Sequence, residues 1–373
     1  MSSIEILSIA SEIPEQKVNS KDILNKIESK ISMKALEMLQ AMDIETRYSV
    51  VDNLPSYLVH EEQRKLLAGV NELGASSIKK CLEKSPHDYN IGLFIAVTNT
   101  AERPLPCMAY EIISMLDEDM MPRDINVINM QNQGCSALIK AFEMASYYLQ
   151  ACPHKQVMIC VSETHTAMFP SITSKEMIRT FPEIRELPEY QQQDATNHLN
   201  NLINSYLFGD GAVSILLGNN AAATFDFYHL TNIDADDKEI LCMNEGGSKM
   251  PCYKNYPKYT LGKQVPQRGA TYSKLLLNQV IDDSRLSKED ISHYLVHTGS
   301  KKIISAVSKN LHLEEQQAKI ALSYFILKNY GNLSSCSIGF MLDNLINEKK
   351  EHGDVLVISF GVGFSGSVAR FGI

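Results

Sequence analysis

Several features that mark particular classes of protein are missing from this sequence. The 44 acidic residues outnumber the 35 basic ones, the net charge is −9, and no basic block stands out, which argues against a nucleic acid partner. No apolar run approaches the roughly 18 residues of a membrane span, so no membrane partner is expected. The eight cysteines form no CxxC pair and lack the histidine spacing of a zinc site, so we expect no metal.

The start of the chain also lacks the pattern of a secretory signal. It has no basic first region, and Glu5 and Glu12 interrupt the apolar residues that a signal would need. Scattered cysteines without a pairing pattern are typical of free thiols in a reducing compartment. The sequence therefore predicts a cytoplasmic protein.

The most informative stretch runs from Asn126 to Leu149. It indicates a short buried strand, a tight turn at Gln133-Gly134-Cys135 and a long helix with one apolar face, formed by Leu138, Phe142, Ala145 and Leu149. Cys135 is expected at the first turn of this helix, where unpaired backbone N–H groups and the helix dipole favour the thiolate. A lone cysteine more often only packs, but the strand, glycine and helix around this one favour a nucleophile.

Further buried strands are expected on both sides of this unit. The apolar segments are residues 4–10, 91–97, 157–161 and 213–217. Residues 170–205 differ, because they are polar and contain three prolines and a run of three glutamines. We interpret them as an excursion over the surface rather than as core.

The second half of the sequence repeats the plan of the first. A glycine turn at Gly331 leads into a helix and then into a buried strand at Val355, with a spacing that matches the path from Cys135 to the strand at Val157. We therefore predict an α/β fold of two similar halves, residues 1–218 and 219–373, related by a pseudo-twofold axis. Ordinary α/β proteins also alternate strands and helices, which is the simpler explanation of the same pattern.

Two polar residues of the second half stand where apolar segments end in loops. His297 follows the strand 293–296 and Asn332 follows Gly331, so both are expected at the seam between the halves, facing Cys135. Both side chains can donate hydrogen bonds to a developing oxyanion, while the cysteine holds an acyl group covalently. Either residue is otherwise an ordinary loop or turn residue. No such setting surrounds the other histidines, which are expected on the surface, among them His154, His165 and His198.

At these positions the sequence resembles the thiolase-fold condensing enzymes, in particular ketoacyl synthase III and the type III, chalcone synthase-like polyketide synthases. The resemblance covers nearly the whole chain and rests on six motifs in the same order: QGCSA around Cys135, CVSETHTAMF at 160–169, LFGDGAVSILLG at 207–218, VHTG at His297, YGNLSSCS at Asn332 and SFGVGFSGSVARF near the C-terminus. It implies a five-layer αβαβα sandwich built from the two duplicated halves, and a homodimer.

The resemblance also implies a mechanism. In such enzymes a thioester of CoA or of an acyl carrier protein acylates the cysteine, here Cys135. The histidine and asparagine, here His297 and Asn332, stabilise the enolate formed from a malonyl-type or β-ketoacyl extender. The backbone N–H groups of Cys135 and of Gly361 or Val362 form the oxyanion hole for the acyl thioester. No cofactor is implied beyond the thioester substrates.

Three further positions match the family in part. Phe169 occupies the place of an aromatic gate in the substrate tunnel, and Met108 or a neighbour would reach toward the acyl pocket of the partner subunit. Glu102 matches a glutamate that some relatives, which condense two long acyl chains, supply as a base from the neighbouring subunit. A core phenylalanine and a solvated loop glutamate are the simpler explanations of two of these residues.

The sequence departs from the type III pattern at several places. Residues 297–300 read HTGS and residues 359–363 read SFGVG, where these synthases usually have HPGG and GFGPG. The segment 170–205 is longer than usual. Tryptophan is absent, so no arginine–tryptophan clamp for the adenine of CoA can be identified, and a carrier-protein donor remains open.

Two functions of different classes follow. The first is a decarboxylative Claisen condensing enzyme of fatty-acid-like or polyketide metabolism. The second is an acyltransferase that passes the acyl group from Cys135 to an oxygen or nitrogen nucleophile, with His297 as general base. Asn332 favours the first, because ester or amide formation has less need of a group that stabilises an enolate. A catalytically silent partner in a heterodimer is a third interpretation, which the presence of all three polar residues disfavours.

Overall fold

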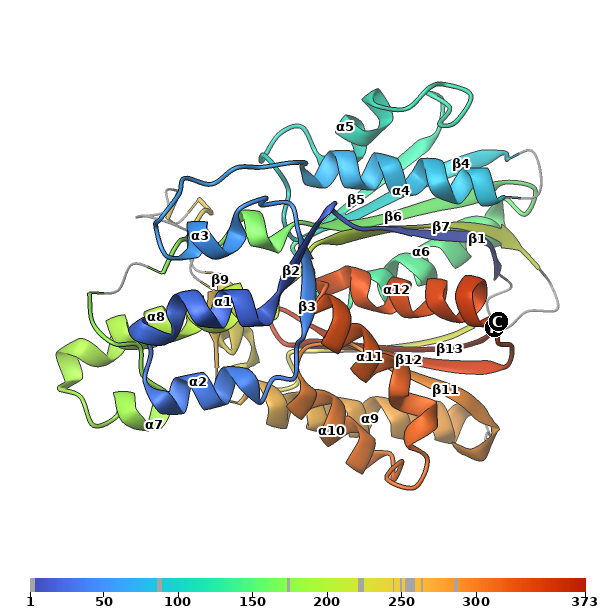
Figure 1. The fold of residues 1–373 in the computed structure, drawn as a ribbon. Helices are drawn as coiled ribbons and strands as arrows, with labels where there is room; N and C mark the ends of the chain where they lie inside the picture. Colours follow the sequence, from blue (N-terminus) through green and yellow to red (C-terminus); the bar gives the residue numbers. More distant parts are fainter. Residues whose placement is uncertain are drawn as a thin grey trace.

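The computed structural model describes residues 4–85, 89–172, 175–220, 225–243, 245–248, 250–251, 259–262, 264–284 and 288–373. Two sheets dominate the fold (Figure 1). The first sheet has the order β1-β7-β6-β4-β5 and consists of β1 (Ile4–Glu12), β4 (Ile91–Thr98), β5 (Asn126–Gln131), β6 (Gln156–Glu163) and β7 (Gly211–Asn219). Every strand predicted in the first half is therefore confirmed, because each apolar segment lies within one of these strands.

The second sheet has the order β11-β12-β13-β8 and consists of β8 (Phe225–Thr231), β11 (Ile291–Val296), β12 (Asp354–Gly361) and β13 (Ser365–Gly372). Counted from β8, its pairings are antiparallel, antiparallel and parallel. The first sheet, counted from β1, begins with the same three pairings. Each sheet uses strands from one half of the chain, and the exact division at residues 218 and 219 stays a prediction.

Helices cover and separate the sheets in five alternating layers (Figure 1). On the outer face of the first sheet lie α4 (Val70–Lys84) and α5 (Met108–Ser114), and on the outer face of the second lie α9 (Val265–Ser284) and α10 (Lys301–Asn310). Between the sheets lie α6 (Ala137–Ala151) and α12 (Ser337–Asp343), in one core that both sheets share. The predicted apolar face of α6 is fully buried there.

A helical lobe packs beside these layers. It shows that the interpretation of residues 170–205 as a surface excursion was incomplete. It contains α1 (Ser20–Ile27), α2 (Met33–Gln40), α3 (Leu54–Leu58), α7 (Phe181–Ile184) and α8 (Glu189–Leu207), with the short ladder of β2 (Gln16–Asn19) and β3 (Thr46–Ser49). Residues 170–205 are not merely a surface excursion. The first turns of α8 are polar and largely accessible, but Leu199, Leu202 and Tyr206 recur at helical spacing and join the core of the lobe.

The buried Arg47 of β3 connects the lobe to the end of α8. Its guanidinium donates hydrogen bonds to the Ser20 hydroxyl at 2.6 Å and to the Tyr206 carbonyl, and it stacks on the Tyr206 ring at 4.7 Å. Burial lowers the pKa of Arg47 to about 10, so the group remains charged at neutral pH. The C-terminal carbonyls of α8 suit this cation, because the negative end of the helix dipole lies there. Arg47 thereby holds Tyr206, which lies two residues before Phe208, in place.

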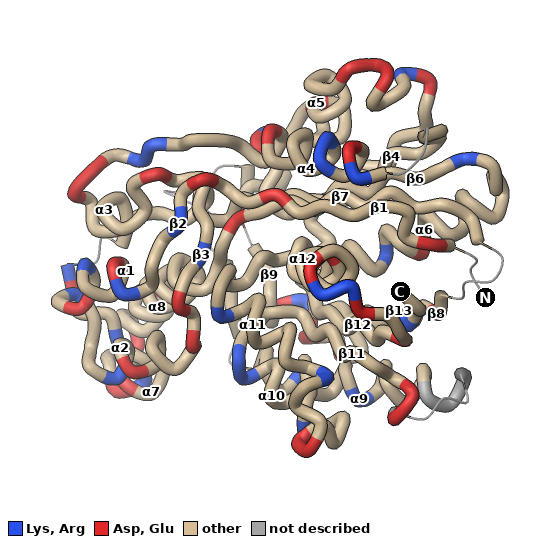
Figure 2. The backbone as a smooth tube through the Cα atoms, turned by 45° about the vertical axis from the view of Figure 1, so that its right-hand side comes forward, with Lys and Arg blue, Asp and Glu red and all other residues tan. Residues whose placement is uncertain are grey.

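The remaining elements are short or lie at the periphery: η1 (Glu28–Lys30), η2 (His165–Ala167), η3 (Asp237–Glu239), β9 (Leu241–Met243), β10 (Tyr259–Leu261), η4 (Lys288–Asp290), η5 (Gln317–Ile320), α11 (Ala321–Tyr330), η6 (Ser334–Cys336) and the π-helical η7 (Asn344–Lys349). Charged residues of both signs are scattered over the outer helices and loops (Figure 2). In the described part of the chain, no helix has the length and apolar character that crossing a membrane requires.

Candidate active site

The turn before Cys135 is held by a side chain from the neighbouring strand. Two residues of this turn, Asn132 and Gly134, have positive φ angles of 59° and 73°. The Gly134 N–H donates a 2.8 Å hydrogen bond to the Asn99 side-chain oxygen, just after β4. The helix begins at Ala137, so Cys135 stands two residues before α6 rather than within its first turn.

A glycine loop from the second half packs directly on this turn. A β-carbon added at Gly134 would overlap the backbone nitrogen of Val362 and lie 2.7 Å from the α-carbon of Gly361. The Ser359 hydroxyl also donates a 2.8 Å hydrogen bond to the Cys135 carbonyl. The backbone of residues 361–362 thus lies beside the turn that carries Cys135, which is the neighbourhood an oxyanion hole between them would need.

Asn332 approaches the same place from another loop of the second half. Its side-chain oxygen accepts a 2.8 Å hydrogen bond from the Ser334 N–H, and the Ser334 hydroxyl lies 3.5 Å from the Cys135 sulfur. Its backbone pairs with the segment around Phe208, at the end of α8. Because the amide oxygen is already occupied within the loop, the amide NH₂ is the group of Asn332 left to bind a substrate oxygen.

His297 lies at the end of β11, next to the strand that carries Ser359. Its backbone N–H donates a 2.9 Å hydrogen bond to the carbonyl of Ile358 on the neighbouring strand. Ile358 directly precedes Ser359, the serine that contacts Cys135. The side chain is buried, and its Nδ1 has no hydrogen-bond partner among the described residues. Burial lowers the pKa of His297 to about 3, so the imidazole is neutral and able to accept a proton or donate one hydrogen bond.

The electrostatic setting of Cys135 contradicts the expectation of a thiolate at rest. Burial raises the pKa of the Cys135 thiol to about 12; the Ser334 hydrogen bond acts in the opposite direction, and the buried Glu163 adds to the increase. The expected dipole effect was argued for a helical residue, but Cys135 precedes α6. Loss of solvation therefore favours the neutral thiol at this position.

We therefore expect alkylation of Cys135 by iodoacetamide to be slow at neutral pH and to accelerate about 10-fold per pH unit between pH 7 and 9, without a plateau, because the thiolate fraction rises in that proportion below the pKa. Peptide mass spectrometry after timed labelling measures this rate. Cys152, which is partly exposed like Cys135, serves as the internal comparison for reagent quality. A plateau below pH 8 would show that the thiolate already exists at rest.

Glu163, at the end of β6, is a buried residue of the site that the sequence did not reveal. Its carboxylate accepts hydrogen bonds from the Asn99 N–H at 3.0 Å, the Asn99 amide at 2.6 Å, the Thr100 hydroxyl at 3.1 Å and the Ser335 hydroxyl. Since Asn99 also holds Gly134, this carboxylate connects the loops after β4, β5 and β6 with the loop of the second half. The only signal in the sequence was an acidic residue at the end of a fully apolar strand.

A cluster of aromatic rings adjoins Glu163. It contains Phe169 together with His165, Phe208 and Tyr259, with ring centroids 4.3 to 6.3 Å apart. Phe169 is buried, in agreement with both explanations considered for it. The surface position expected for His165 is wrong, because only 3% of this residue is exposed. Phe208 and Tyr259 were not identified from the sequence, since neither carries a polar signal or a distinctive spacing.

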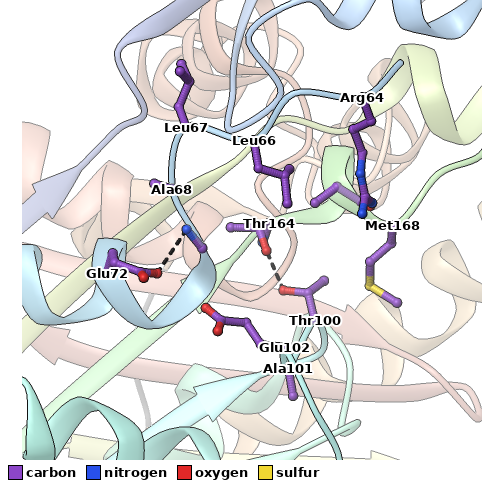
Figure 3. Close-up of a pocket in the computed structure, with 12 residues that line it drawn as sticks. Arg64, Leu66, Leu67, Ala68, Glu72, Thr100, Ala101, Glu102, Thr164 and Met168 are labelled. Atoms are coloured by element: carbon purple, nitrogen blue, oxygen red, sulfur yellow. Dashed lines mark hydrogen bonds between the residues drawn. The ribbon is translucent and has the colours of Figure 1, made fainter.

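Glu102 lines a cavity of about 500 Å³ on the outer side of the same loops (Figure 3). The cavity lies between the segment 64–69, the start of α4, the loop after β4 and η2. Glu102 accepts a 3.1 Å hydrogen bond from the Asn71 N–H, at the first turn of α4. Partial burial raises the pKa of Glu102, and the Asn71 N–H partly offsets this. Within its own subunit the carboxylate thus binds the N-terminus of α4, and its role as a base for a neighbouring subunit stays a prediction.

Met108 does not face outward as its expected role requires. It is 2% exposed and packs in the core beneath α4 and α5, because it is the first residue of a helix whose apolar face covers the first sheet. Its neighbour Leu105, in the preceding loop, is 83% exposed. The sequence left open whether Met108 or a neighbour reaches another subunit. Met108 is buried, whereas its neighbour Leu105 has an exposed side chain that is free to do so.

The geometry combines a thiol, two neutral hydrogen-bond donors and a backbone loop at one seam. Such a set can hold an acyl group covalently and stabilise negative charge on oxygen. Among the described residues, no group of three or more His, Cys, Asp or Glu side chains is placed to hold a metal ion.

Comparison with known proteins finds a matching family model and several related sequences. Residues 281–371 match the family model for the C-terminal part of 3-oxoacyl-[acyl-carrier-protein] synthase III. A β-ketoacyl-[acyl-carrier-protein] synthase III of Blochmanniella pennsylvanica is 21% identical over 299 residues, covering 79% of this chain and 82% of the relative. A putative chalcone synthase of Bacillus subtilis is 28% identical over 242 residues, covering 64% and 60% of the two chains.

Solved structures share the fold over almost the whole chain. A 3-oxoacyl-(acyl-carrier-protein) synthase III superposes with a TM-score of 0.76 at 14% identity, covering 99% of both chains. The type III polyketide synthase domain of Steely1 from Dictyostelium superposes with a TM-score of 0.77 at 16% identity, again covering 99% of both. The five layers are therefore those of the thiolase-like fold, as the motifs predicted.

Proposed function

We propose that this chain, which belongs to the group of β-ketoacyl synthase III and type III polyketide synthase enzymes, joins an acyl group held on Cys135 to a malonyl-type or β-ketoacyl extender. The roles proposed for the individual residues rest on one observation: the loops that carry Cys135, Asn332 and Gly361 meet at one place. The Cys135 sulfur lies 3.5 Å from Ser334 in the Asn332 loop, while the backbone of Gly361 and Val362 packs on the turn before it.

Loading of the acyl group begins with the neutral thiol of Cys135. The sulfur forms a bond to the carbonyl carbon of an acyl thioester, and the bond from that carbon to the donor thiol breaks. The thiol proton passes to neutral His297 and then to the departing thiolate, so no charge accumulates. The backbone N–H groups of Cys135 and of Gly361 or Val362 bind the oxyanion of the tetrahedral intermediate.

Condensation then uses the other two polar residues. The carbon–carboxylate bond of a malonyl-type thioester breaks, carbon dioxide leaves, and the electron pair forms an enolate. The Asn332 amide and the His297 N–H donate hydrogen bonds to the enolate oxygen. The enolate carbon attacks the acyl carbonyl, the bond to the Cys135 sulfur breaks, and the sulfur takes up a proton.

Incubation of the protein with an acyl thioester and malonyl-CoA, and in parallel with a malonyl carrier protein, tests this function. We expect release of carbon dioxide and formation of a 3-ketoacyl thioester by the wild-type protein. The same assay decides whether CoA or a carrier protein delivers the extender. A protein that acylates Cys135 but releases no carbon dioxide with either extender would contradict condensation.

Acyl transfer to an alcohol or amine is a second candidate. The unpartnered Nδ1 of neutral His297 supports it, because a general base needs a free lone pair in the site. In that reaction the acyl group leaves Cys135 without any malonyl-type extender. Product formation from an acyl thioester and a simple alcohol or amine alone would support this function over condensation.

A homodimer and a reducing compartment complete the proposal. Six of the described cysteines, Cys81, Cys107, Cys135, Cys152, Cys160 and Cys336, carry free thiols, which supports the cytoplasm as the place of action. Exposed apolar side chains gather near the loop after β4 and on α5, which supports an interface there; they are Leu66, Leu67, Leu105, Tyr110 and Met115. No cofactor is proposed beyond the thioester substrates.

Replacement of Leu105 by glutamate is expected to weaken the dimer. Burying an exposed leucine at a subunit interface is favourable, and a charge there raises the dissociation constant by roughly 30-fold or more. Sedimentation at micromolar concentration compares the variant with the wild type. Met33→Glu is the matched control, because Met33 is 70% exposed on α2, in the helical lobe. A wild-type monomer, or equal effects of both substitutions, would remove this interface.

A further inference from the structure

His165 is held flat among aromatic rings beside the site. Its ring stacks on Phe208 with centroids 4.3 Å apart, and Phe169 and Tyr259 lie at 6.2 and 6.3 Å. The backbone of Phe208 pairs with Asn332. The position of His165 is therefore set by the same contacts that fix Asn332.

Neither ring nitrogen of His165 has a hydrogen-bond partner among the described residues, although the residue is 3% exposed. A buried polar group without a partner costs about 1–3 kcal/mol, so such groups in native proteins are normally satisfied by water or a ligand. Burial also lowers the pKa of His165 to about 3. The imidazole is thus neutral and carries one N–H donor.

The nearest charged group does not use this donor. Glu163 lies 3.6 Å from Nε2 of His165, which is too far for a hydrogen bond. Four other donors from Asn99, Thr100 and Ser335 already occupy the Glu163 carboxylate, which has about four acceptor positions. The His165 proton is therefore free to occupy whichever nitrogen faces a ligand.

Short contacts connect this donor with the nucleophile. Ser334 lies 3.5 Å from the Cys135 sulfur and 3.4 Å from the Asn99 amide, which in turn binds Glu163 beside His165. Ser334, Asn99 and Glu163 thus link Cys135 to His165, and we take the aromatic cluster as the side toward which an acyl chain on Cys135 extends. The aromatic cluster contributes no charged side chain, so it suits a neutral oxygen that only accepts hydrogen bonds. A ketone has that chemistry.

We infer that the N–H of His165 binds the 3-keto oxygen of an acyl chain carried on Cys135, so that the site is built for 3-ketoacyl thioesters as substrates or intermediates. This inference rests on the proposed function, since it requires an acyl group on Cys135. It goes further by naming the group that the chain must carry. His165 is then a specificity-determining residue that touches the substrate away from the reacting carbon.

The test compares two acyl groups of equal length that differ in one ketone. Acetoacetyl and butyryl thioesters of N-acetylcysteamine avoid any dependence on recognition of CoA or a carrier protein. Intact-mass spectrometry gives the rate of Cys135 acylation by each. His165→Phe retains an aromatic ring for stacking and removes the N–H. We expect the acetoacetyl-to-butyryl rate ratio to fall about 10-fold in this variant, the effect of one neutral hydrogen bond, with the butyryl rate nearly unchanged.

Several outcomes separate this inference from the proposed function. His165→Gln, which retains an N–H donor, is expected to keep most of the wild-type ratio. Equal slowing of both substrates in His165→Phe, or an unchanged ratio, would overturn the inference while leaving the condensing function intact. Absence of any adduct on Cys135 in the wild-type protein would instead contradict the proposed function itself.

A measurement on the wild-type protein alone guards against a variant that fails to fold. Acylation with acetoacetate labelled with ¹³C at the ketone carbon allows the resonance of that carbon to be observed by NMR. Hydrogen bonding to the oxygen moves this resonance downfield from its position for the free thioester in an aprotic solvent. A ketone resonance at the aprotic value would show an oxygen without a donor and would overturn the inference.

Discussion

Replacement of Asn332 by alanine is expected to leave acylation of Cys135 nearly unchanged and to slow condensation by about 10²- to 10³-fold, the usual effect of removing one oxyanion donor. The amide oxygen of Asn332 is bound within its own loop by the Ser334 N–H at 2.8 Å, so only the NH₂ group serves a substrate. Loading does not form an enolate and has no need of that group. The acyl-enzyme should therefore accumulate.

Intact-mass spectrometry and carbon dioxide release measure the two steps separately. Asn329→Ala is a matched control, because Asn329 lies nearby on α11 and, among the described residues, its side chain binds only the Phe325 carbonyl. Full product formation by Asn332→Ala, without any malonyl-type extender, would contradict condensation and favour acyl transfer.

Replacement of His297 by alanine is expected to impair both steps. The Cys135 thiol has a pKa near 12, so loading requires a proton acceptor, and the neutral imidazole of His297 is the one proposed here. Loss of such a base slows a reaction by about 10²- to 10⁴-fold. Loss of the same imidazole also removes one donor to the enolate. Rates of acyl-adduct formation and of carbon dioxide release should therefore both fall.

The double variant distinguishes cooperation from independent effects. In the proposed mechanism His297 and Asn332 act on the same enolate oxygen, so the loss in the double variant should be smaller than the product of the two single losses. The acyltransferase function predicts a different pattern, in which His297→Ala abolishes transfer and Asn332→Ala has little effect. Normal acylation by His297→Ala would show that another group accepts the thiol proton.

Local patterns in the sequence were sufficient for the strands and for α6. The segment 91–97 has the length of a strand and is apolar throughout, which indicates a strand covered on both faces. The strand β4 is indeed buried along its entire length. The spacing of Leu138, Phe142, Ala145 and Leu149 fixed the buried face of α6 in the same way. These features depend on neighbours in the chain, which a sequence displays directly.

Errors arose where the outcome depends on residues distant in the chain. The thiol of Cys135 was expected to ionise, but its pKa is governed by burial under loops of the second half. His165 was assigned to the surface because it lacks the strand-end setting that singled out His297. Its actual neighbours, Phe208 and Tyr259, come from separate segments. Residues 170–205 likewise acquired a core only through contacts with the N-terminal lobe.

Partial information existed for two other residues. Met108 or a neighbour was expected to reach toward the partner subunit, but the orientation of α5, which buries Met108, cannot be read from the sequence. Glu163 was visible in the sequence only as an acidic residue at the end of an apolar strand and was not identified as a site residue. Its importance became visible only when donors from Asn99, Thr100 and Ser335 were found around one carboxylate.

The central claim is that Cys135 carries the acyl group that the extender then attacks. A pulse of acyl thioester, removal of the excess, and a chase with malonyl thioester tests this most directly, with the adduct located by peptide mass spectrometry. The account predicts that the acyl mass appears on the peptide containing Cys135 and disappears during the chase, as carbon dioxide and a 3-ketoacyl product form together. An adduct on another cysteine, or one on Cys135 that persists through the chase, would contradict it.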